Sequence, residues 1–256
     1  MKHSWLACVC VVAGAALAQE PSAGPPDYAD RLRPTNDWQR VPRDPLPPPT
    51  DPIGLVTRRA RDQRVDHLIG APRPLFGPPA DRIAGEGLER VTTGPDRIEL
   101  PEIPDFGSRT VVIGSFTDYD TVLSESRRSI YSEMHIRVER VLTTVKANLV
   151  PGATITVLAL GGTVRMGPTV IEHYLHPSSE MLIPQHRYLL FLYYSPDCDS
   201  YDVVKSWELL GGRVLPFQEE DVLRARRGTS LYAGMDEAEF IAAVSAAIER
   251  ESKPGR

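Results

Sequence analysis

The chain has 256 residues and a formal net charge of −5, with 34 acidic side chains against 29 basic ones. A chain of this length can bury a sizeable core without disulfide bonds. The acidic balance argues against nucleic acid as a partner, because binding to phosphate requires a basic surface.

The first residues have the features of a secretory signal peptide. A basic start precedes an apolar run of 14 residues from Trp5 to Ala18, and a polar, proline-bearing stretch begins at Gln19. Such a run is too short for a membrane-spanning helix, which needs about 20 residues. We expect residues 1–18 to be removed by cleavage between Ala18 and Gln19, which leaves a secreted or periplasmic chain. No later segment is apolar for long enough to predict a transmembrane segment in the mature chain.

Removal of the signal peptide leaves one of the three cysteines, Cys198. An internal disulfide is therefore not expected. Cys198 lies among serine, proline and aspartate residues that are typical of a turn, which predicts an exposed free thiol or a dimer through a disulfide with a second copy. A catalytic thiol is disfavoured because no basic or histidine-bearing motif adjoins it.

Residues 19–106 form a proline-rich segment that we interpret as a linker or tail. Seventeen of the 24 prolines lie between Pro21 and Pro104, and each removes a backbone donor and fixes φ. Two islands interrupt this composition. Ile53 to Leu68 predicts a short arginine-rich helix, and Arg82 to Ile98 predicts a turn or an edge strand.

The helical island carries Arg58, Arg59, Arg61 and Arg64. A charge run of this kind is most often a solvated face, and we adopt that interpretation. An acidic partner or a membrane surface is the alternative.

The folded domain is expected at residues 107–256, organised around a long strand from Ser129 to Lys146. Apolar and polar side chains alternate from Met134 to Val138, as in a half-buried strand. The alternation breaks after Val138, which predicts a β-bulge at Glu139 or Arg140.

Shorter strands are predicted on both sides of this one. They comprise residues 109–116, 154–160, 186–194 and a hairpin-like pair around Gly211-Gly212. Residues 117–127 are expected to form a loop, and so are residues 163–179, which hold glycine and proline without a clear period. The strand 186–194 is apolar on both faces, so it requires a cover outside the barrel.

That cover is predicted to be a C-terminal helix at residues 236–251. Asp236 begins a D-x-x-E capping box. Phe240, Val244 and Ile248 form one apolar stripe, which we expect to pack on the outer face of strand 186–194.

The strand count is low, and a single helix must close one face, which favours a barrel over a sandwich. The sequence therefore predicts a mainly β fold, a small Greek-key (OB-like) barrel with one C-terminal α-helix, preceded by a long proline-rich irregular segment.

The stretches YSEMHIRVERVL, PGATITVLALGG and RYLLFLYY carry a family resemblance. The matching residues are Tyr131, Val138, Val141, Leu142, Gly161, Gly162, Tyr188, Leu189, Leu190, Phe191 and Leu192. In these residues the chain, over about 109–217, resembles bacterial secreted domains related to the netrin and tissue-inhibitor-of-metalloproteinases (NTR-like) module. The resemblance implies an OB-fold. The animal inhibitors present an amino-terminal cysteine to a metalloproteinase zinc, and this chain has none near Gln19, so their inhibitory mechanism does not transfer.

The best metal candidates are three histidines. His173 and His176 have H-x-x-H spacing, and His186 is near them in sequence. The motif lacks the H-E-x-x-H glutamate, and flanking prolines disfavour a helix that would present both rings. We therefore expect ordinary loop histidines, and we predict no metal ion and no cofactor.

No catalytic residues are predicted. A G-x-S-x-G elbow, a phosphate-binding glycine loop and a dinucleotide fingerprint are all missing from the sequence. Four carboxylates, Asp118, Asp120, Glu172 and Glu180, would form an acid–base pair only if the fold brought them together. Their turn-rich settings favour solvated loop positions.

These observations predict an exported noncatalytic binding or interaction module, with a protein or another envelope component as its unknown ligand. Two alternatives stay open from the sequence. One is a secreted hydrolase with an unrecognised loop site, and the other is a structural envelope component.

Overall fold

The structure, a computed structural model, describes residues 38, 41–69, 102–104, 109–166, 169–173 and 182–252. The predicted signal peptide and the island from Arg82 to Ile98 lie outside these residues, as do His176 and Glu180.

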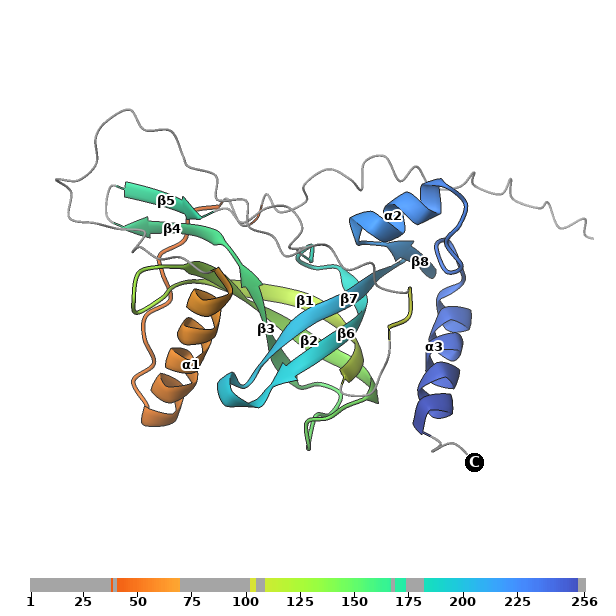
Figure 1. The fold of residues 1–256 in the computed structure, drawn as a ribbon, viewed down its shortest axis with the longest axis horizontal. Helices are drawn as coiled ribbons and strands as arrows, with labels where there is room; N and C mark the ends of the chain where they lie inside the picture. The colour runs from red at the N-terminus through yellow and green to blue at the C-terminus, as the bar shows by residue number, and fades with distance from the viewer. Residues whose placement is uncertain are drawn as a thin grey trace, which may run out of the picture.

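Five strands form a closed barrel (Figure 1). They are β1 (Arg109–Leu123), β2 (Ile130–Thr143), β3 (Thr154–Leu160), β6 (Arg187–Ser195) and β7 (Ser200–Leu210). Neighbouring strands are antiparallel in the order β3-β2-β1-β6-β7, and a parallel pairing of Val157 with Tyr201 joins β3 to β7. β6 returns beside β1 after a three-strand meander, which is Greek-key order.

One further strand, β8 (Arg213–Pro216), extends the sheet beyond β7. The predicted fold class is confirmed: the protein is mainly β, with a small Greek-key (OB-like) barrel and a C-terminal helix. The alternation predicted in β2 is also confirmed, since Met134, Ile136 and Val138 are all buried in the barrel interior.

The predicted bulge in β2 is present at Glu139. The pairing of β1 with β2 slips between Ile113 and Gly114, and Glu139 is the extra residue on β2. A Cβ atom on Gly114 would lie 2.8 Å from the backbone oxygen of Arg137. Glycine at this position therefore allows the two strands to approach closely where the barrel bends.

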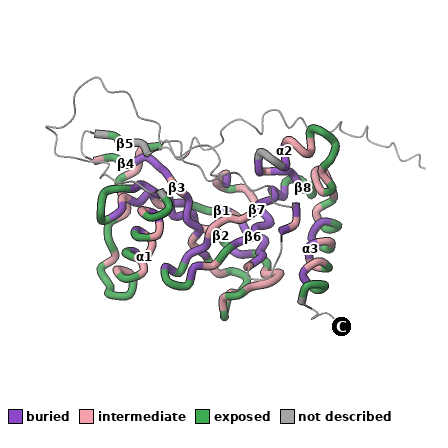
Figure 2. The backbone as a smooth tube through the Cα atoms, viewed as in Figure 1, coloured by how far each residue is buried: buried purple, intermediate pink, exposed green. Residues whose placement is uncertain are grey.

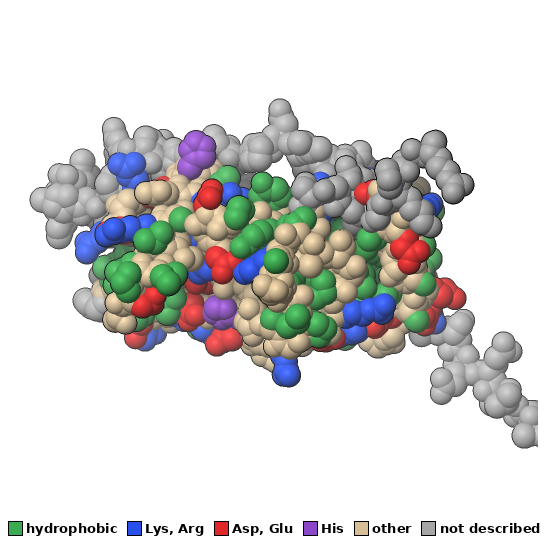
Figure 3. Space-filling model, turned by 90° about the horizontal axis from the view of Figure 1, so that it is seen from below, with side chains coloured by type: hydrophobic (Ala, Val, Ile, Leu, Met, Phe, Trp, Pro, Cys, Tyr) green, Lys and Arg blue, Asp and Glu red, His purple; other side chains and the backbone are tan. Residues whose placement is uncertain are grey.

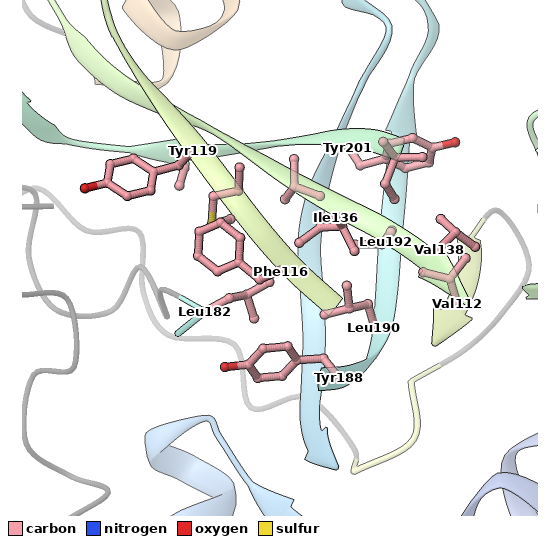
Figure 4. Packing of buried hydrophobic residues seen from close by; sticks show 14 residues of the cluster. Val112, Phe116, Tyr119, Ile136, Val138, Leu182, Tyr188, Leu190, Leu192 and Tyr201 are labelled. Atoms are coloured by element: carbon pink, nitrogen blue, oxygen red, sulfur yellow. The ribbon is translucent and has the colours of Figure 1, made fainter. Parts of the chain in front are cut away.

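Apolar side chains from several strands fill the barrel. Phe116, Ile136 and Leu190 are completely buried in this interior. Figure 4 shows Phe116, Leu182 and Tyr188 pointing toward one another at one end of the interior. The barrel is thus a packed core rather than an open channel.

The helix α3 (Glu237–Ser252) covers the outer face of β6, as predicted. Phe240 and Val244 are completely buried with Leu189 and Phe191 in a second apolar cluster. Asp236 caps the helix, since its Oδ1 accepts backbone N–H groups of the first turn at 2.9 and 3.3 Å. Figure 2 shows α3 with one buried side and one exposed side.

Two segments that were predicted to be loops form strands. β1 continues to Leu123 because Tyr119 and Val122 face the core and the strand stays paired with β2. The expected loop at 163–179 contains a hairpin of β4 (Gly162–Met166) and β5 (Thr169–His173).

The helix α2 (Glu219–Arg226) has no counterpart in the sequence prediction. An ion pair at 2.8 Å joins Lys205 on β7 to Asp221 on α2, and both side chains are completely buried. Because this helix is held by a buried charged pair as well as by Val222, its apolar pattern is short and weak.

Part of the proline-rich segment is helical. The helix α1 (Pro52–Ile69) forms where the sequence predicts a short arginine-rich helix, and Asp51 Oδ1 accepts the N–H of Gly54 at 2.7 Å in its first turn. Figure 1 shows α1 beside the barrel, at the opposite end from α3. The segment before β1 is therefore not irregular throughout, while its division from the barrel at residue 106 stays a prediction.

Candidate binding face of the barrel

The helix α1 packs on the barrel through a mostly polar stripe. Its buried residues are Arg58, Asp62 and Val65, which share one face because they are spaced by a helical turn. Val65 alone among them is apolar, and it packs with Val122 and Tyr131. A helix on a core normally presents leucine or isoleucine at such positions. The docking of α1 therefore depends largely on charged and hydrogen-bonded pairs.

Glu133 on β2 is the central anion under the helix. Arg61 Nη1 donates to Glu133 Oε2 at 2.9 Å, and Arg58 Nη1 lies 4.0 Å from Glu133 Oε1. The Glu133 side chain is only 6% exposed. A carboxylate that is buried to this extent requires cationic partners, because its transfer out of water costs several kcal/mol.

Two arginines of α1 reach β7 and the connection between β6 and β7, which contains the short 3-10 helix η4 (Pro196–Cys198). Arg61 Nε donates to the carbonyl oxygen of Cys198 at 2.9 Å, and its Nη2 donates to that of Asp199 at 3.0 Å. Arg64 forms an ion pair with Asp202 on β7. Burial raises the pKa of Asp202 above its usual value, and Arg64 opposes that shift.

Asp62 connects α1 to the start of β2 and to the turn before it. Its carboxylate accepts the hydroxyl of Tyr131 at 2.8 Å and the backbone N–H of Glu125 at 2.9 Å, and Arg58 Nε lies 3.4 Å away. Burial raises the pKa of Asp62, and the hydrogen bonds from Glu125 and Tyr131 and the positive charge of Arg58 oppose the shift. Burial also raises the pKa of the Tyr131 hydroxyl, which therefore serves as a hydrogen-bond donor.

The turn at residues 124–129, between β1 and β2, is the third contact of α1. Asp66 accepts hydrogen bonds from the hydroxyls of Ser126 and Ser129. Arg59 and Glu125 also pair, at 3.2 Å, but both of their side chains are more than half exposed. The last pair is of the kind that contributes little to stability.

Together these contacts define a binding face, which comprises Tyr131 and Glu133 of β2, the turn 124–129, the connection 196–199 and Asp202. In OB-type barrels, ligands bind the face of the second and third strands and the loops that join strands one to two and four to five. The turn 124–129 and the connection 196–199 occupy these loop positions. The chain's own helix α1 therefore covers the surface that this architecture uses for ligands.

The residues before α1 also lie along the barrel. Trp38 Nε1 donates to the carbonyl oxygen of Leu182 at 2.9 Å, and the Tyr119 hydroxyl donates to that of Trp38 at 2.6 Å. The Arg43 guanidinium lies 3.7 Å from the centre of the Tyr119 ring. The backbone N–H of Leu46 donates to Thr121 at 2.8 Å. These contacts fix the chain immediately before α1.

Of the three candidate histidines, the structure describes the side chain of His186. His186 Nδ1 is 2.6 Å from Glu208 Oε1, and the Glu208 side chain is 1% exposed. The backbone of His173 ends β5, and His176 lies outside the described residues. Among the described residues, no three histidine, cysteine, aspartate or glutamate side chains lie close enough to hold a metal ion.

Of the four candidate carboxylates, the structure describes the side chains of Asp118 and Asp120. Asp118 lies 3.5 Å from Arg43, and Asp120 lies 2.9 Å from His135 Nε2. The backbone of Glu172 lies in β5, where it pairs with Thr163. Asp118 and Asp120 thus each have a basic partner of their own.

The expected exposure of Cys198 is wrong. The residue is 2% exposed, and its Sγ lies 2.9 Å from the hydroxyl of Ser200. Cys198 is the buried residue of η4, which connects β6 to β7. A disulfide with a second copy would require this connection to open first.

The interpretation of the α1 arginines as a solvated face is also wrong for three of the four residues. Arg58 is buried, and Arg61 and Arg64 are paired with the barrel, whereas Arg59 is exposed. A missed signal was the helical spacing of Arg58, Asp62 and Val65, which marks one inward face. Sequence alone did not identify the carboxylates that receive these arginines.

The surface charges are mixed in sign. On the side seen in Figure 3, acidic and basic side chains are interspersed instead of gathering by sign. None of the helices in the described part of the chain has the length and apolar character to cross a membrane.

Comparison with known proteins does not identify a family for this chain. No protein-family model matches the chain, and no curated protein matches its sequence.

Proposed function

We propose that the protein is an exported, noncatalytic binding module whose ligand site is the binding face now covered by α1. The single observation that carries this proposal is the docking of α1. The barrel already holds a peptide helix through directed pairs, among them the 2.9 Å contact between Arg61 and the buried Glu133. The predicted signal peptide supports export, and the resemblance to NTR-like domains supports a binding role.

The face suits recognition of a peptide rather than turnover of a substrate. It offers carboxylates and backbone carbonyls that are fixed by the barrel strands, and these accept charge-assisted hydrogen bonds from cationic groups. Fixed acceptors lose little conformational freedom on binding, which favours affinity. Glu133 and the carbonyls of Cys198 and Asp199 supply this arrangement.

The proposal is tested by affinity capture with the tagged full chain in the envelope of an exporting cell. We expect mass spectrometry to show that the captured chain begins at Gln19, and we expect this chain to retain a partner. Glu133→Gln should lose this partner. The control Glu139→Gln makes the same change on β2 at a site that contacts Ser115 and Arg187 instead of α1. Equal capture of the partner by Glu133→Gln and Glu139→Gln would overturn the assignment of the ligand site to the binding face.

A secreted hydrolase is the second candidate, because of the pair formed by His186 and Glu208. A half-exposed imidazole that is held at 2.6 Å by a buried carboxylate can act as a general base. Within the described residues, His186 Nε2 has no hydrogen-bond partner. Screening with peptidase, esterase and glycosidase substrates decides between the candidates. Turnover that is abolished by His186→Ala would replace the binding-module proposal.

A further inference from the structure

We propose that the binding face is an exchangeable docking site for an arginine-rich helix of a partner protein, and that α1 is its built-in competitor. This inference rests on the proposed function and specifies the class of ligand. The acceptor groups of the face favour an arginine-rich helix as the ligand. Glu133, Asp202 and the carbonyl of Asp199 all receive guanidinium groups of one helix.

The apolar part of the α1 interface is small. Val65 is completely buried, but Ile53, Val56 and Leu68 are 79%, 66% and 55% exposed. Undocking of α1 therefore exposes little apolar surface, and the charged pairs that break can form again with the arginines of another helix. Elements with few buried apolar contacts are those that open locally at low free energy.

The fit of α1 to the face is incomplete. Glu133 Oε1, Arg58 Nε and Arg64 Nε are buried and have no hydrogen-bond partner among the described residues. Burial of a polar atom without a partner opposes docking. A helix that places a donor on Glu133 Oε1 would remove this penalty, so the face is open to a better occupant than α1.

The covalent connections of α1 permit exchange. Leu46 is fixed to Thr121, and residues 47–51 join it to the start of α1. On the other side, residues 70–101 precede Glu102, whose carboxylate accepts the N–H of Leu231 at 2.9 Å. These 32 residues can span up to about 110 Å when extended. The helix can therefore leave the face while both flanking segments stay on the barrel.

Competition from the tethered α1 determines how tightly a separate helix is expected to bind the face. A tethered segment acts at an effective concentration of roughly millimolar, so it masks the face from a free helix of similar intrinsic affinity. Weakening α1 should therefore increase binding of a helix in trans, whereas weakening the face should abolish it. These opposite directions distinguish exchange from a purely structural role of α1.

The probe is a fluorescein-labelled peptide of residues 51–69, titrated by anisotropy into the full chain. We expect Arg61→Ala/Arg64→Ala protein to bind the peptide at least tenfold more tightly than wild type. Adding Glu133→Gln to that variant should abolish the gain. The matched control Arg59→Ala, at the exposed arginine of the same helix, should bind the peptide as wild type does. A peptide with alanine at positions 61 and 64 should not bind.

Several results would overturn the proposal. One is peptide binding to Arg61→Ala/Arg64→Ala that is no tighter than to wild type, in a chain that unfolds cooperatively. Another is a dimer that forms by exchange of α1 between copies, seen by light scattering, which would assign the face to a second copy. If Arg61→Ala/Arg64→Ala does not fold, the test uses wild type, in which excess peptide should increase the hydrogen exchange of the α1 amides. Unchanged exchange of these amides would also overturn the proposal. Envelope capture that depends on Glu133, without peptide binding, would retain the proposed function and reject the arginine-rich ligand.

Discussion

Arg61 of α1 donates from Nη1 to Oε2 of Glu133 on β2 at 2.9 Å, across 72 residues of sequence. The two side chains are 13% and 6% exposed. This pair joins a segment of proline-rich composition to β2 of the barrel.

The first prediction concerns the loss of this guanidinium. Arg61→Ala leaves Glu133 buried with Arg58 as its remaining cation, and we expect a cost of about 3 kcal/mol in α1 docking, at the low end for breaking a buried pair. That cost corresponds to roughly a hundredfold larger open population. Thermolysin cleavage next to the buried Val65 reports this population. Arg59→Ala is the control, because exposed pairs contribute about 0–1 kcal/mol.

The second prediction concerns α3. Phe240→Ala removes a completely buried ring that packs with Trp207 at a centroid distance of 5.5 Å. We expect a loss of about 3 to 5 kcal/mol in the free energy of unfolding. Urea denaturation measures this loss, and Glu249→Ala on the exposed side of α3 should change it little. An unchanged midpoint in Phe240→Ala, with a lost partner interaction, would make α3 a recognition surface instead.

The strand pattern allowed most of the barrel to be predicted from the sequence. The predicted residues 154–160 of β3 match the structure, and Glu139 is the extra residue of the bulge, because alternation and its interruption are local signals. The end of β1 was not predictable in the same way. Tyr119 is buried partly by Trp38, which lies 81 residues earlier, and a single strand does not reveal such a partner.

The binding face was less predictable than the barrel. Arg58, Asp62 and Val65 have helical spacing, but two of the three are charged, so hydrophobic periodicity does not mark them as buried. Their burial depends on Glu133 and Tyr131 of the barrel. Such pairings arise from tertiary structure, which is why composition alone favoured a solvated face.

The third prediction concerns pH. Burial alone would raise the pKa of Glu139, but hydrogen bonds from Ser115 and Arg187 outweigh it and hold the pKa below its usual value. A lowered pKa stabilises the folded protein above pH 4.5, the ordinary value, and this stabilisation is lost as the pH falls through the folded pKa. Arg187 also pairs with Glu237 of α3, so acid should loosen the attachment of α3.

The urea midpoint of wild type and Glu139→Gln, measured at pH 6 and pH 3.5, checks this prediction. The variant should show the smaller loss on acidification. The raised pKa values of Asp62 and Asp202 act in the opposite direction, since their contribution weakens as the pH rises. Both carboxyls are present in both proteins, so the difference between the two proteins isolates Glu139. Equal losses would contradict the assigned role of Glu139.

The fourth prediction concerns the bend of the barrel. Gly114→Ala places a Cβ 2.8 Å from both the Arg137 oxygen and Ile136 Cγ2. Because a backbone oxygen cannot give way easily, we expect a loss of about 1 to 3 kcal/mol on unfolding by urea. Gly152→Asn is the contrast, because this turn glycine has φ of +88° and open space around it, and asparagine tolerates left-handed backbone. Equal stability of Gly114→Ala and wild type would show that the strands do not approach so closely.

The central claim is that charged pairs hold α1 on the barrel, and hydrogen–deuterium exchange of the full chain tests it most directly. In wild type at low salt, we expect amides of α1 from Arg58 to Val65 to be protected, since an isolated helix of 18 residues is only marginally stable. Glu133→Gln, or high salt, should remove this protection while β1 and β2 stay protected. Rapid exchange of α1 in wild type, or protection that is unaffected by Glu133→Gln, would contradict the claim.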